Sequence, residues 1–553
     1  MPSVETASAI LESLDALGVT HVLYCPGSRS APFAYALEAG SFGGDARAVL
    51  DERGAGFAAV GLARTGALPA VVVTSGTAVA ELAPAVLEAS HARLPLLLLT
   101  ADRPGELRGV GASQATDQSG LFGTHVRASV DLEPQEASPS LVGHLARAVA
   151  AACGAPSGAP GPVQVNVAFR DPLTPVRPAC DCGDEVGASF VPCPTRVLAA
   201  PAVPVPWEDV VGPAAAGLIV AGEGASPRAR EWSAASGFPL LAEPASGAWS
   251  GGGVTPFEQT LVASSLGSEV DAVVVIGRPT LSRPIQALLA RPDVRVVVVD
   301  PHAPWVDISG NAAVVVADLE PAREPIRAAQ AEWASRVRQA ARDAGERIES
   351  LLSAGSGRTM LDLARAVAAS TSGPLVLGAS NPVRAFDLAV PTLEGRVVHS
   401  NRGQAGIDGT IATAVGVCLG SGYAGEASAS EGERVTAVIG DLTACHDASS
   451  LALASSVRAN LDIVVADDQG GGIFATLEHG RAASPEAYER WFGLAQSVDY
   501  EALAAAYGVA FARAETPAQL AQLLETGAAG PRLVHAPVER AAHLYPALRD
   551  VLS

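Results

Sequence analysis

Two acidic residues follow two apolar, strand-like runs between residues 435 and 474, and this pattern constrains the fold more than any other. Asp441 follows the run 435-VTAVIG, and Asp468 follows the run 461-LDIVVA, with a helical stretch between them. In a parallel strand–helix–strand unit, which takes about 30 residues, both acids reach the carboxyl edge of one sheet. Ligands of open α/β folds bind at that edge. The sequence therefore predicts a parallel sheet with two carboxylates at its binding edge.

The residues around these acids favour a magnesium diphosphate as the ligand. Magnesium usually takes one or two carboxylates together with phosphate oxygens. Three glycines, 470–472, follow Asp468 directly, so the backbone can come close to a ligand and offer a carbonyl oxygen. A helix that we expect to begin near Ala444 would direct its first N–H groups at phosphate.

A calcium-binding loop is the alternative interpretation of this segment. Asp467, Gln469, Gly472 and Glu478 occupy positions 1, 3, 6 and 12 of an EF-hand register. However, position 5 is Gly471, and a β-branched run precedes the loop where an EF-hand has a helix. The pattern therefore favours a strand followed by a magnesium site.

Composition places the chain among globular proteins that do not bind nucleic acid. It has 553 residues, 48% of them hydrophobic, which is enough for three to four domains with sizeable cores. The formal net charge of −21 argues against nucleic acid or an anionic membrane as partner, because phosphate groups need clustered cations. No apolar run reaches the ~18 residues of a membrane span, and no basic leader precedes the first helical pattern. We expect a cytoplasmic protein.

Two residue types exclude several chemistries. The chain contains no lysine, so all 37 of its cationic side chains are arginine, which excludes Schiff-base enzymes and Walker-type nucleotide sites. The seven cysteines form an odd set without a C-x-x-C pair, which disfavours a disulfide framework. Cys180 and Cys182 could form a metal pair, but they lie in a linker rich in proline and acid, and we assign them no function.

Three segments alternate apolar runs with helical patterns, as parallel sheets do. The first contains the runs 19-VTHVLYC, 47-RAVLD, 70-AVVVT, 95-PLLLLT and 162-PVQVNV. The second contains 217-GLIVAG, 271-DAVVVIG and 294-VRVVVVD, and a charged helical pattern over 323–352 follows it. The third contains the two acidic motifs. We predict three doubly wound, parallel-sheet α/β domains over residues 1–178, 190–350 and 355–553.

The acidic motifs resemble the signature of the thiamine diphosphate enzymes, in which Gly-Asp-Gly is followed further along by Asn-Asn. Here the two elements read 440-GDL and 467-DDQ, and an aspartate at the second asparagine position keeps an oxygen ligand. Three doubly wound domains are similar to the decarboxylase branch of that superfamily. The resemblance implies a pyrimidine-binding first domain, a central domain and a diphosphate-binding third domain. It also implies Mg²⁺, or Mn²⁺ in its place, on Asp441, Asp468 and the Gly470 carbonyl.

The resemblance further implies two residues that act on the cofactor. Glu52 lies at the end of the second predicted strand, and it would engage N1′ of the pyrimidine ring among small apolar neighbours. The alternative is a glutamate at a helix N-terminus that interacts with the helix dipole. Ile407 matches the residue that bends the cofactor, with a buried turn isoleucine as the alternative. The implied cofactor contacts are Glu52, Ile407, Gly440, Asp441, Leu442, Thr443, Asp468 and Gly472.

Longer strings are similar to one menaquinone-biosynthesis branch of the superfamily. They are 25-CPGSRSAP, 74-TSGTAVAEL, 100-TADRPGEL, 376-VLGASNPVR and 399-HSNRGQAGIDG, and the similarity runs from near residue 7 to the C-terminus. Members of this branch decarboxylate 2-oxoglutarate and add the resulting carbanion to isochorismate in a 1,4-addition. Both substrates are dicarboxylates, which arginine forks bind well. The implied substrate residues are Ser28, Arg29, Arg103, Gln114, Ser380, Arg384, Arg402, Ile473 and Phe474, with Arg278 and Arg283; Ser113 stands where relatives often carry asparagine.

Three alternative functions remain open from the sequence, one of which is an acidic calcium-binding interaction protein that binds calcium without thiamine diphosphate. Another is a different thiamine diphosphate-dependent 2-oxoacid decarboxylase or carboligase, which would not require isochorismate. The third is a non-catalytic regulatory protein that binds a magnesium nucleotide and has no need of Glu52. In the superfamily, the two cofactor-binding domains at one site come from different subunits, which implies a homodimer or homotetramer with shared active sites.

Overall fold

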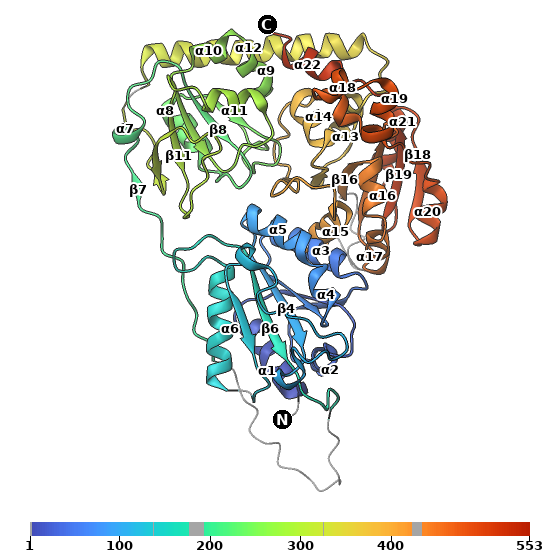
Figure 1. The fold of residues 1–553 in the computed structure, drawn as a ribbon. Helices are drawn as coiled ribbons and strands as arrows, with labels where there is room; N and C mark the ends of the chain where they lie inside the picture. The colour runs from blue at the N-terminus through green and yellow to red at the C-terminus, as the bar shows by residue number, and fades with distance from the viewer. Residues whose placement is uncertain (1–2, 137, 176–192, 325, 423–433) are drawn as a thin grey trace. The chain divides into compact units, whose positions relative to one another are not determined.

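The computed structural model describes residues 3–136, 138–175, 193–324, 326–422 and 434–553. Within these ranges the strands form parallel sheets of six, five and six strands, with helices between them, and one further pair of short strands (Figure 1). The predicted α/β fold class is confirmed. No helix in the described ranges combines the length and the apolar character needed to cross a membrane. Cys180 and Cys182 lie outside the described residues.

The described residues pack into two compact units. One contains Met1–Ala200 with Ala412–Gly422, and the other contains Pro201–Ile411 with Tyr423–Ser553. The second unit therefore holds both the five-stranded sheet and the second six-stranded sheet. Each of the three larger sheets lies inside one of the three predicted segments. The predicted boundaries of the three domains stay a prediction.

The first sheet has the strand order β2-β1-β3-β4-β6-β5. Its strands are β1 (His21–Tyr24), β2 (Asp45–Ala48), β3 (Pro69–Val73), β4 (Leu96–Asp102), β5 (Ser129–Leu132) and β6 (Pro162–Ala168). Five of the six coincide with the predicted apolar runs, whereas β5 has the half-polar sequence SVDL and was missed. The order reverses between β1 and β3, and this reversal is where ligands of doubly wound sheets bind.

Helices cover the first sheet in two layers. They are α1 (Ser3–Ala16), α2 (Ala31–Glu38), α3 (Glu52–Arg64), α4 (Thr77–Ala80), α5 (Ala83–Ala92) and α6 (Pro139–Ala152). Helices α1, α2 and α6 share a core with Val22, Val72, Leu97 and Leu99 of the strands. Because side chains alternate along a strand, the intervening strand residues face the other layer, where α3 and α5 pack together (Figure 1).

The central sheet has the order β12-β11-β10-β8-β9. Its strands are β8 (Gly217–Ala221), β9 (Leu240–Ala242), β10 (Ala272–Ile276), β11 (Arg295–Val299) and β12 (Ala312–Val316). The three predicted runs are the three central strands, whereas the two edge strands were missed. Strand β9 has only three residues and β12 is partly exposed, so neither forms a clear apolar run in the sequence. The helices here are α7 (Trp207–Val210), α8 (Ala229–Ser236), α9 (Glu258–Ala263), α10 (Ser265–Glu269), α11 (Arg283–Leu289) and α12 (Ala328–Ser353).

The third sheet repeats the topology of the first, with the order β15-β14-β16-β17-β19-β18. Its strands are β14 (Leu375–Leu377), β15 (Val398–His399), β16 (Val435–Gly440), β17 (Leu461–Asp467), β18 (Ala510–Arg513) and β19 (Arg532–Pro537). The predicted strands β16 and β17 are direct parallel neighbours, with Gly440 opposite Ala466. Because β16 and β17 are parallel, the acidic motifs that follow them lie at the same edge of the sheet. The strand order reverses between β14 and β16, beside these motifs.

The last part of the chain contains helices that carry or flank the candidate site, and among them the helix over 410–420 belongs to the first compact unit from Ala412 onward. The helices are α13 (Met360–Ser370), α14 (Asn381–Ala389), α15 (Thr410–Gly420), α16 (Asp441–His446), α17 (Ser450–Ser456), α18 (His479–Ala482), α19 (Pro485–Tyr488), α20 (Tyr500–Ala506), α21 (Pro517–Thr526) and α22 (Leu544–Arg549). Helix α16 begins at Asp441, three residues before the predicted start at Ala444, because β16 runs directly into it without a connecting loop.

Candidate active site

Asp441 is the first residue of α16 and has a buried carboxylate. Its side chain is 2% exposed, and its Oδ2 atom has no hydrogen-bond partner in the described part of the chain. Burial raises the pKa of Asp441 to about 6, although hydrogen bonds from backbone N–H groups, including that of Gly470, oppose the shift. A buried oxygen without a donor is an acceptor that a cation can satisfy.

Asp468 follows the end of β17 and faces Asp441. Burial, together with the charge of Asp441, raises the pKa of Asp468 to about 7. A divalent cation between the two carboxylates would relieve this repulsion. Asp467 is engaged elsewhere, because His535 lies 2.9 Å from its Oδ2 atom. The calcium-loop alternative is wrong in its structural requirement, since a strand and not a helix precedes this loop.

Glycine is required where the loop turns over Asp468. A Cβ atom on Gly472 would lie 1.9 Å from Oδ2 of Asp468, and Gly470 has a φ of +128°, which other residues rarely adopt. Together the Asp441 and Asp468 carboxylates and the Gly470 carbonyl offer the hard oxygen ligands that magnesium prefers. These residues fit a magnesium diphosphate, with Leu442 and Thr443 in the first turn of α16.

The loop continues into a short 3-10 helix, η4 (Gly472–Thr476), that carries Ile473 and Phe474. Both side chains are half-buried, and the Phe474 ring packs 5.6 Å from that of Phe492. Ile407 is half-buried in the turn before α15. Its role toward the cofactor stays a prediction.

Arginines gather around the end of β14. The Nη1 atoms of Arg384 and Arg402 donate to the same carbonyl, that of Ala379, at 3.1 and 3.2 Å, and Arg384 also donates to the Ser380 carbonyl at 2.8 Å. Arg278 donates to the Arg402 carbonyl at 2.9 Å. Burial and the charge of Arg402 lower the pKa of Arg384 to about 10. Four predicted substrate residues, Ser380, Arg278, Arg384 and Arg402, are thus brought together.

Arg283 stands apart from this group at the surface. Its side chain is 69% exposed and lies 3.9 Å from Glu478. Burial raises the pKa of the Tyr545 hydroxyl well above its ordinary value, and the charges of Asp468 and Arg384 also act on this group. This hydroxyl has no hydrogen-bond partner in the described ranges. The sequence offered no signal for Tyr545, because it lies in the C-terminal helix α22, far from every motif.

Three buried carboxyl groups form a cluster, and two of them, Glu243 and Asp387, are affected by the charge of Arg402. Glu243, Glu258 and Asp387 are 2–3% exposed. Glu243 accepts a hydrogen bond from the Leu281 N–H at 2.6 Å, and Asp387 accepts one from the Gln259 side chain, whereas both oxygens of Glu258 lack a partner among the described residues. Burial raises the pKa of all three, and repulsion from a neighbouring carboxylate adds to the shift of Glu243 and Glu258. Sequence reasoning missed them because they lie far apart in unremarkable strings.

Glu52 begins α3, which corrects the prediction that it ends the second strand. Strand β2 stops at Ala48, because its only neighbour, β1, ends opposite it at Tyr24. Asp51 then caps the helix by accepting a hydrogen bond from the Gly54 N–H at 3.1 Å. Glu52 is half-buried and not enclosed by the small residues of α3. The alternative interpretation, a glutamate at a helix N-terminus, thus describes its position correctly.

Glu52 lines a polar cavity of about 570 Å³ at the switch point of the first sheet. The lining residues are Asp51, Glu52, Arg53, Thr74, Ser75, Thr77, Ala78, Glu81 and Gln114. The lining residues from Thr74 to Glu81 were not predicted as site residues. The string TSGT, which directly follows β3, was the available signal, because polar residues at a strand end often line a site.

Two arginines and Gln114 are held close to this cavity. Arg103 donates from Nη1 to the Ser75 hydroxyl and to the Gln114 carbonyl at 2.5 Å, and Gln114 Nε2 donates to the Ser75 carbonyl at 2.8 Å. Arg29 donates to the Phe169 carbonyl at 2.9 Å. Burial and the charge of Arg29 lower the pKa of Arg103. Ser28 and Ser113 lie exposed in the same two loops.

Comparison with known proteins identifies both half-sites. Residues 4–121 match the N-terminal TPP binding domain of thiamine pyrophosphate enzymes, and residues 385–536 match the C-terminal TPP binding domain. A relative from Kineococcus radiotolerans is 42% identical over 96% of this chain and 95% of its own length. Relatives from Renibacterium salmoninarum and a Nocardioides species are each 39% identical, over 98% and 97% of this chain and 95% of theirs. All three are named 2-succinyl-5-enolpyruvyl-6-hydroxy-3-cyclohexene-1-carboxylate synthase, and the chain belongs to this family of thiamine pyrophosphate enzymes.

Proposed function

We propose that this protein decarboxylates 2-oxoglutarate and joins the product to isochorismate by 1,4-addition, which gives 2-succinyl-5-enolpyruvyl-6-hydroxy-3-cyclohexene-1-carboxylate in menaquinone biosynthesis. One observation supports the substrate assignment most directly. The arginine cluster lies at the end of β14, and β14 pairs directly with β16, the strand that leads into Asp441, so anion-binding groups lie beside the cofactor half-site. Arginine forks bind carboxylates with two parallel hydrogen bonds, which suits two dicarboxylate substrates.

Thiamine diphosphate, when bound, supplies the group that stabilises the carbanion formed by decarboxylation. The proposal gives Asp441, Asp468 and the Gly470 carbonyl the role of holding Mg²⁺ against the diphosphate, and Mn²⁺ suits the same oxygen ligands. Glu52 holds the proton at N1′ of the pyrimidine ring. Arg384 and Arg402 bind substrate carboxylates, and their hydrogen bonds to the Ala379 carbonyl set the orientation of both side chains.

The direct test is mass spectrometry of reactions that contain purified protein, thiamine diphosphate, magnesium and 2-oxoglutarate, with and without isochorismate. We expect a product with the summed mass of both substrates less carbon dioxide, formed only when isochorismate is present. Glu52→Gln should lower turnover by roughly 10²–10⁴-fold, the usual contribution of a positioned acid–base group, while the cofactor still binds.

The other outcomes separate the alternatives. Equal release of carbon dioxide without isochorismate would make the protein a simple 2-oxoacid decarboxylase and remove the acceptor assignment. Full activity of the Glu52→Gln variant would remove Glu52 from the mechanism. Binding of magnesium nucleotide in preference to thiamine diphosphate would instead favour the non-catalytic regulatory protein.

We further propose that the enzyme is a homodimer, or a pair of dimers, in which Glu52 of one subunit and Asp441 of the other serve one active site. Co-expression of Glu52→Gln and Asp441→Asn chains with different tags tests this proposal. A purified mixed dimer would contain one intact site and keep about half of the wild-type activity, as two-fold symmetry requires. An inactive mixed dimer would place both residues of a site in one chain.

The proposal also retains the cytoplasmic location expected from the sequence. The five cysteines that the structure describes, Cys25, Cys153, Cys193, Cys418 and Cys445, are free thiols. Free thiols are typical of proteins in reducing compartments. Fractionation of the source cells with an antibody to the protein would test the location.

A further inference from the structure

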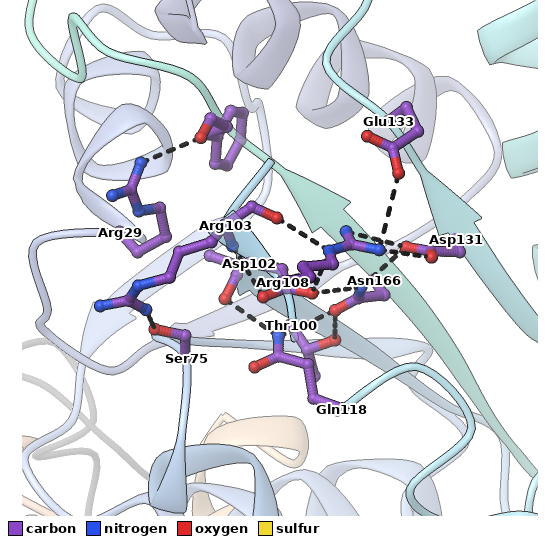
Figure 2. A network of polar contacts seen from close by, with 12 residues as sticks. Arg29, Ser75, Thr100, Asp102, Arg103, Arg108, Gln118, Asp131, Glu133 and Asn166 are labelled. Atoms are coloured by element: carbon purple, nitrogen blue, oxygen red, sulfur yellow. Dashed lines mark hydrogen bonds and ion pairs between the residues drawn. The ribbon is translucent and has the colours of Figure 1, made fainter. Parts of the chain in front are cut away.

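A buried polar network lies beneath Arg103 at the carboxyl edge of the first sheet (Figure 2). Asp102, the last residue of β4, is 1% exposed, and its carboxylate accepts hydrogen bonds from the Arg103 N–H at 2.7 Å and from Asn166 Nδ2 at 2.9 Å. The Nε atom of Arg108 lies 3.1 Å from the same carboxylate and donates to the Arg103 carbonyl at 2.9 Å. Both backbone polar groups of Arg103 are therefore fixed by this network.

Arg108 itself is anchored from a second strand. Its Nη1 and Nη2 atoms donate to the two carboxylate oxygens of Asp131, in β5, at 2.7 and 3.3 Å. Asp131 in turn accepts a hydrogen bond from Asn166, in β6, at 2.7 Å. Bidentate arginine–carboxylate pairs have a defined geometry as well as additional energy. The Arg108 guanidinium is thus held in one orientation by residues of three strands, as Figure 2 shows.

A layer of fully buried amides extends the network to the neighbouring loop. Gln118 Nε2 donates to Asn166 Oδ1 at 2.8 Å and to the Ala101 carbonyl at 3.1 Å, and its Oε1 accepts from the Gly76 N–H at 3.3 Å. Gly76 follows Ser75, the residue whose hydroxyl accepts from the Arg103 guanidinium. Buried networks in which every polar group is satisfied make their surroundings rigid. The loops after β3 and β4 are thereby held in one arrangement.

This arrangement leaves one edge of Arg103 available. Its Nη1 atom is used by Ser75 and Gln114. In the described part of the chain, its Nε and Nη2 atoms have no hydrogen-bond partner. Nε and Nη2 form one fork of a guanidinium, the arrangement that binds a carboxylate with two parallel hydrogen bonds. Arg103 therefore presents a free fork, and the charge of Arg29 lies nearby.

We propose that Arg108 is a positioning residue for substrate binding: held by Asp102 and Asp131, it fixes the backbone of Arg103 so that the Nε–Nη2 fork of Arg103 meets a substrate carboxylate. This inference rests on the proposed function, in which Arg103 binds a dicarboxylate substrate. Arg108 does not itself contact the substrate, so its effect must pass through Arg103. That requirement makes the inference testable.

The chain offers a matched control whose partner lies on the same loop. Arg170, which follows β6, forms an ion pair at 2.7 Å with Glu106 of the loop after β4, and both side chains are more than half exposed. This pair ties the segment after β4 to the end of β6, but it does not touch the Arg103 backbone. Arg170→Ala therefore removes a tether of the loop without removing the support of Arg103.

The experiment compares steady-state kinetics of Arg103→Ala, Arg108→Ala, Arg170→Ala and the Arg103→Ala/Arg108→Ala double variant, with each dicarboxylate varied in turn. Arg103→Ala identifies the substrate that it binds as the one whose KM rises. We expect Arg108→Ala to raise the KM of the same substrate by about tenfold, with a smaller effect on kcat, and to leave thiamine diphosphate affinity unchanged. Arg170→Ala should leave both KM values unchanged.

The double variant decides how Arg108 acts. If Arg108 works through Arg103, Arg108→Ala has no further effect on KM once Arg103 is alanine, since coupled residues are not additive. Multiplied effects, or a KM rise for the other substrate, would overturn the inference. A parallel loss of cofactor affinity and thermal stability would reduce Arg108 to a structural residue and overturn it as well.

Two further outcomes keep the test decisive. If Arg108→Ala does not fold, Asp131→Asn weakens the bidentate clamp without altering Arg108, and it should raise the same KM by a smaller factor, whereas an unchanged KM would contradict the inference. Arg108→Lys should restore part of the lost affinity, because an ammonium can reach either carboxylate but cannot reproduce the fork. If Arg103→Ala itself changes neither KM, the substrate role of Arg103 in the proposed function fails, which is a result distinct from additivity.

Discussion

At residue 472, the absence of a side chain leaves room for the Asp468 carboxylate. The position of Asp441 and Asp468 at one edge was predictable because each follows an apolar run, and the carboxyl ends of parallel strands meet at one edge. The contacts that orient the arginines were not predictable from the sequence. Arg384 and Arg402 donate to the backbone carbonyl of Ala379, and backbone carbonyl groups carry no sequence signal. Tyr545 and Glu258 were not predicted either, because neither residue belongs to a sequence motif.

Gly472→Ala should weaken metal-dependent binding of thiamine diphosphate. The added methyl group would lie 1.9 Å from Oδ2 of Asp468, so this carboxylate must move away from its metal-binding position. We expect the cofactor affinity measured with magnesium to fall by about tenfold or more, the usual cost of disturbing the support of a metal ligand. Isothermal titration calorimetry with and without magnesium measures this effect.

A suitable control is Gly143→Ala in α6, where the nearest atom to the new methyl group is a terminal Arg147 nitrogen at 3.5 Å. That variant should bind the cofactor as the wild type does. Unchanged affinity of Gly472→Ala would show that Asp468 is not confined by residue 472, and would remove the steric explanation for glycine there.

At the scale of elements, the start of α3 positions Glu52. The apolar run 47-RAVLD predicted a strand up to residue 51, but β2 ends at Ala48, because a strand extends only as far as a neighbour pairs with it. Strand pairing is a tertiary property that a run of apolar residues does not encode. The helix then begins where Asp51 can cap it.

Asp51→Ala should reduce activity, whereas Asp51→Asn should retain most of it. Asp51 accepts from the Gly54 N–H, and removal of such a cap costs about 1 kcal/mol of helix stability, while asparagine caps a helix as well as aspartate. Misplacement of Glu52 by even a fraction of a turn should lower kcat by roughly tenfold to a hundredfold. Thermal unfolding and steady-state kinetics of both variants test this prediction, and equal activities of the alanine and asparagine variants would contradict it.

At the scale of the whole molecule, the cluster of Glu243, Glu258 and Asp387 makes folding depend on pH. The pKa of each carboxyl is raised by burial above its ordinary value of about 4, so the folded chain binds more protons than the unfolded chain. Stability is then complete at pH values below the ordinary pKa and is lost as the pH rises through the raised values. We expect the unfolding temperature to fall from about pH 5 to about pH 8, between the ordinary pKa and the raised pKa values of Glu243 and Asp387.

Glu258→Gln should flatten this dependence. Glutamine resembles the neutral carboxyl and cannot ionise, so the variant should gain about 1 kcal/mol at pH 8.5, which corresponds to about 1–2 °C in unfolding temperature for a unit of this size. Differential scanning calorimetry at pH 6 and pH 8.5 measures the slope. Glu269→Gln serves as control, because Glu269 is exposed and paired with Arg336, which lowers its pKa. A slope in Glu258→Gln as steep as in the wild type would contradict the prediction.

The sequence by itself determined the fold class, the family and the position of the two carboxylates proposed to bind metal, because these depend on local order: apolar runs, the residues that end them, and strings such as SNRGQAGIDG. Tertiary structure alone decided which residues support these groups. The Arg108 network joins residues 102, 108, 131 and 166, and the acidic cluster joins residues 243, 258 and 387. Such contacts arise from strand order and chain packing, which place distant residues together and exclude water from them.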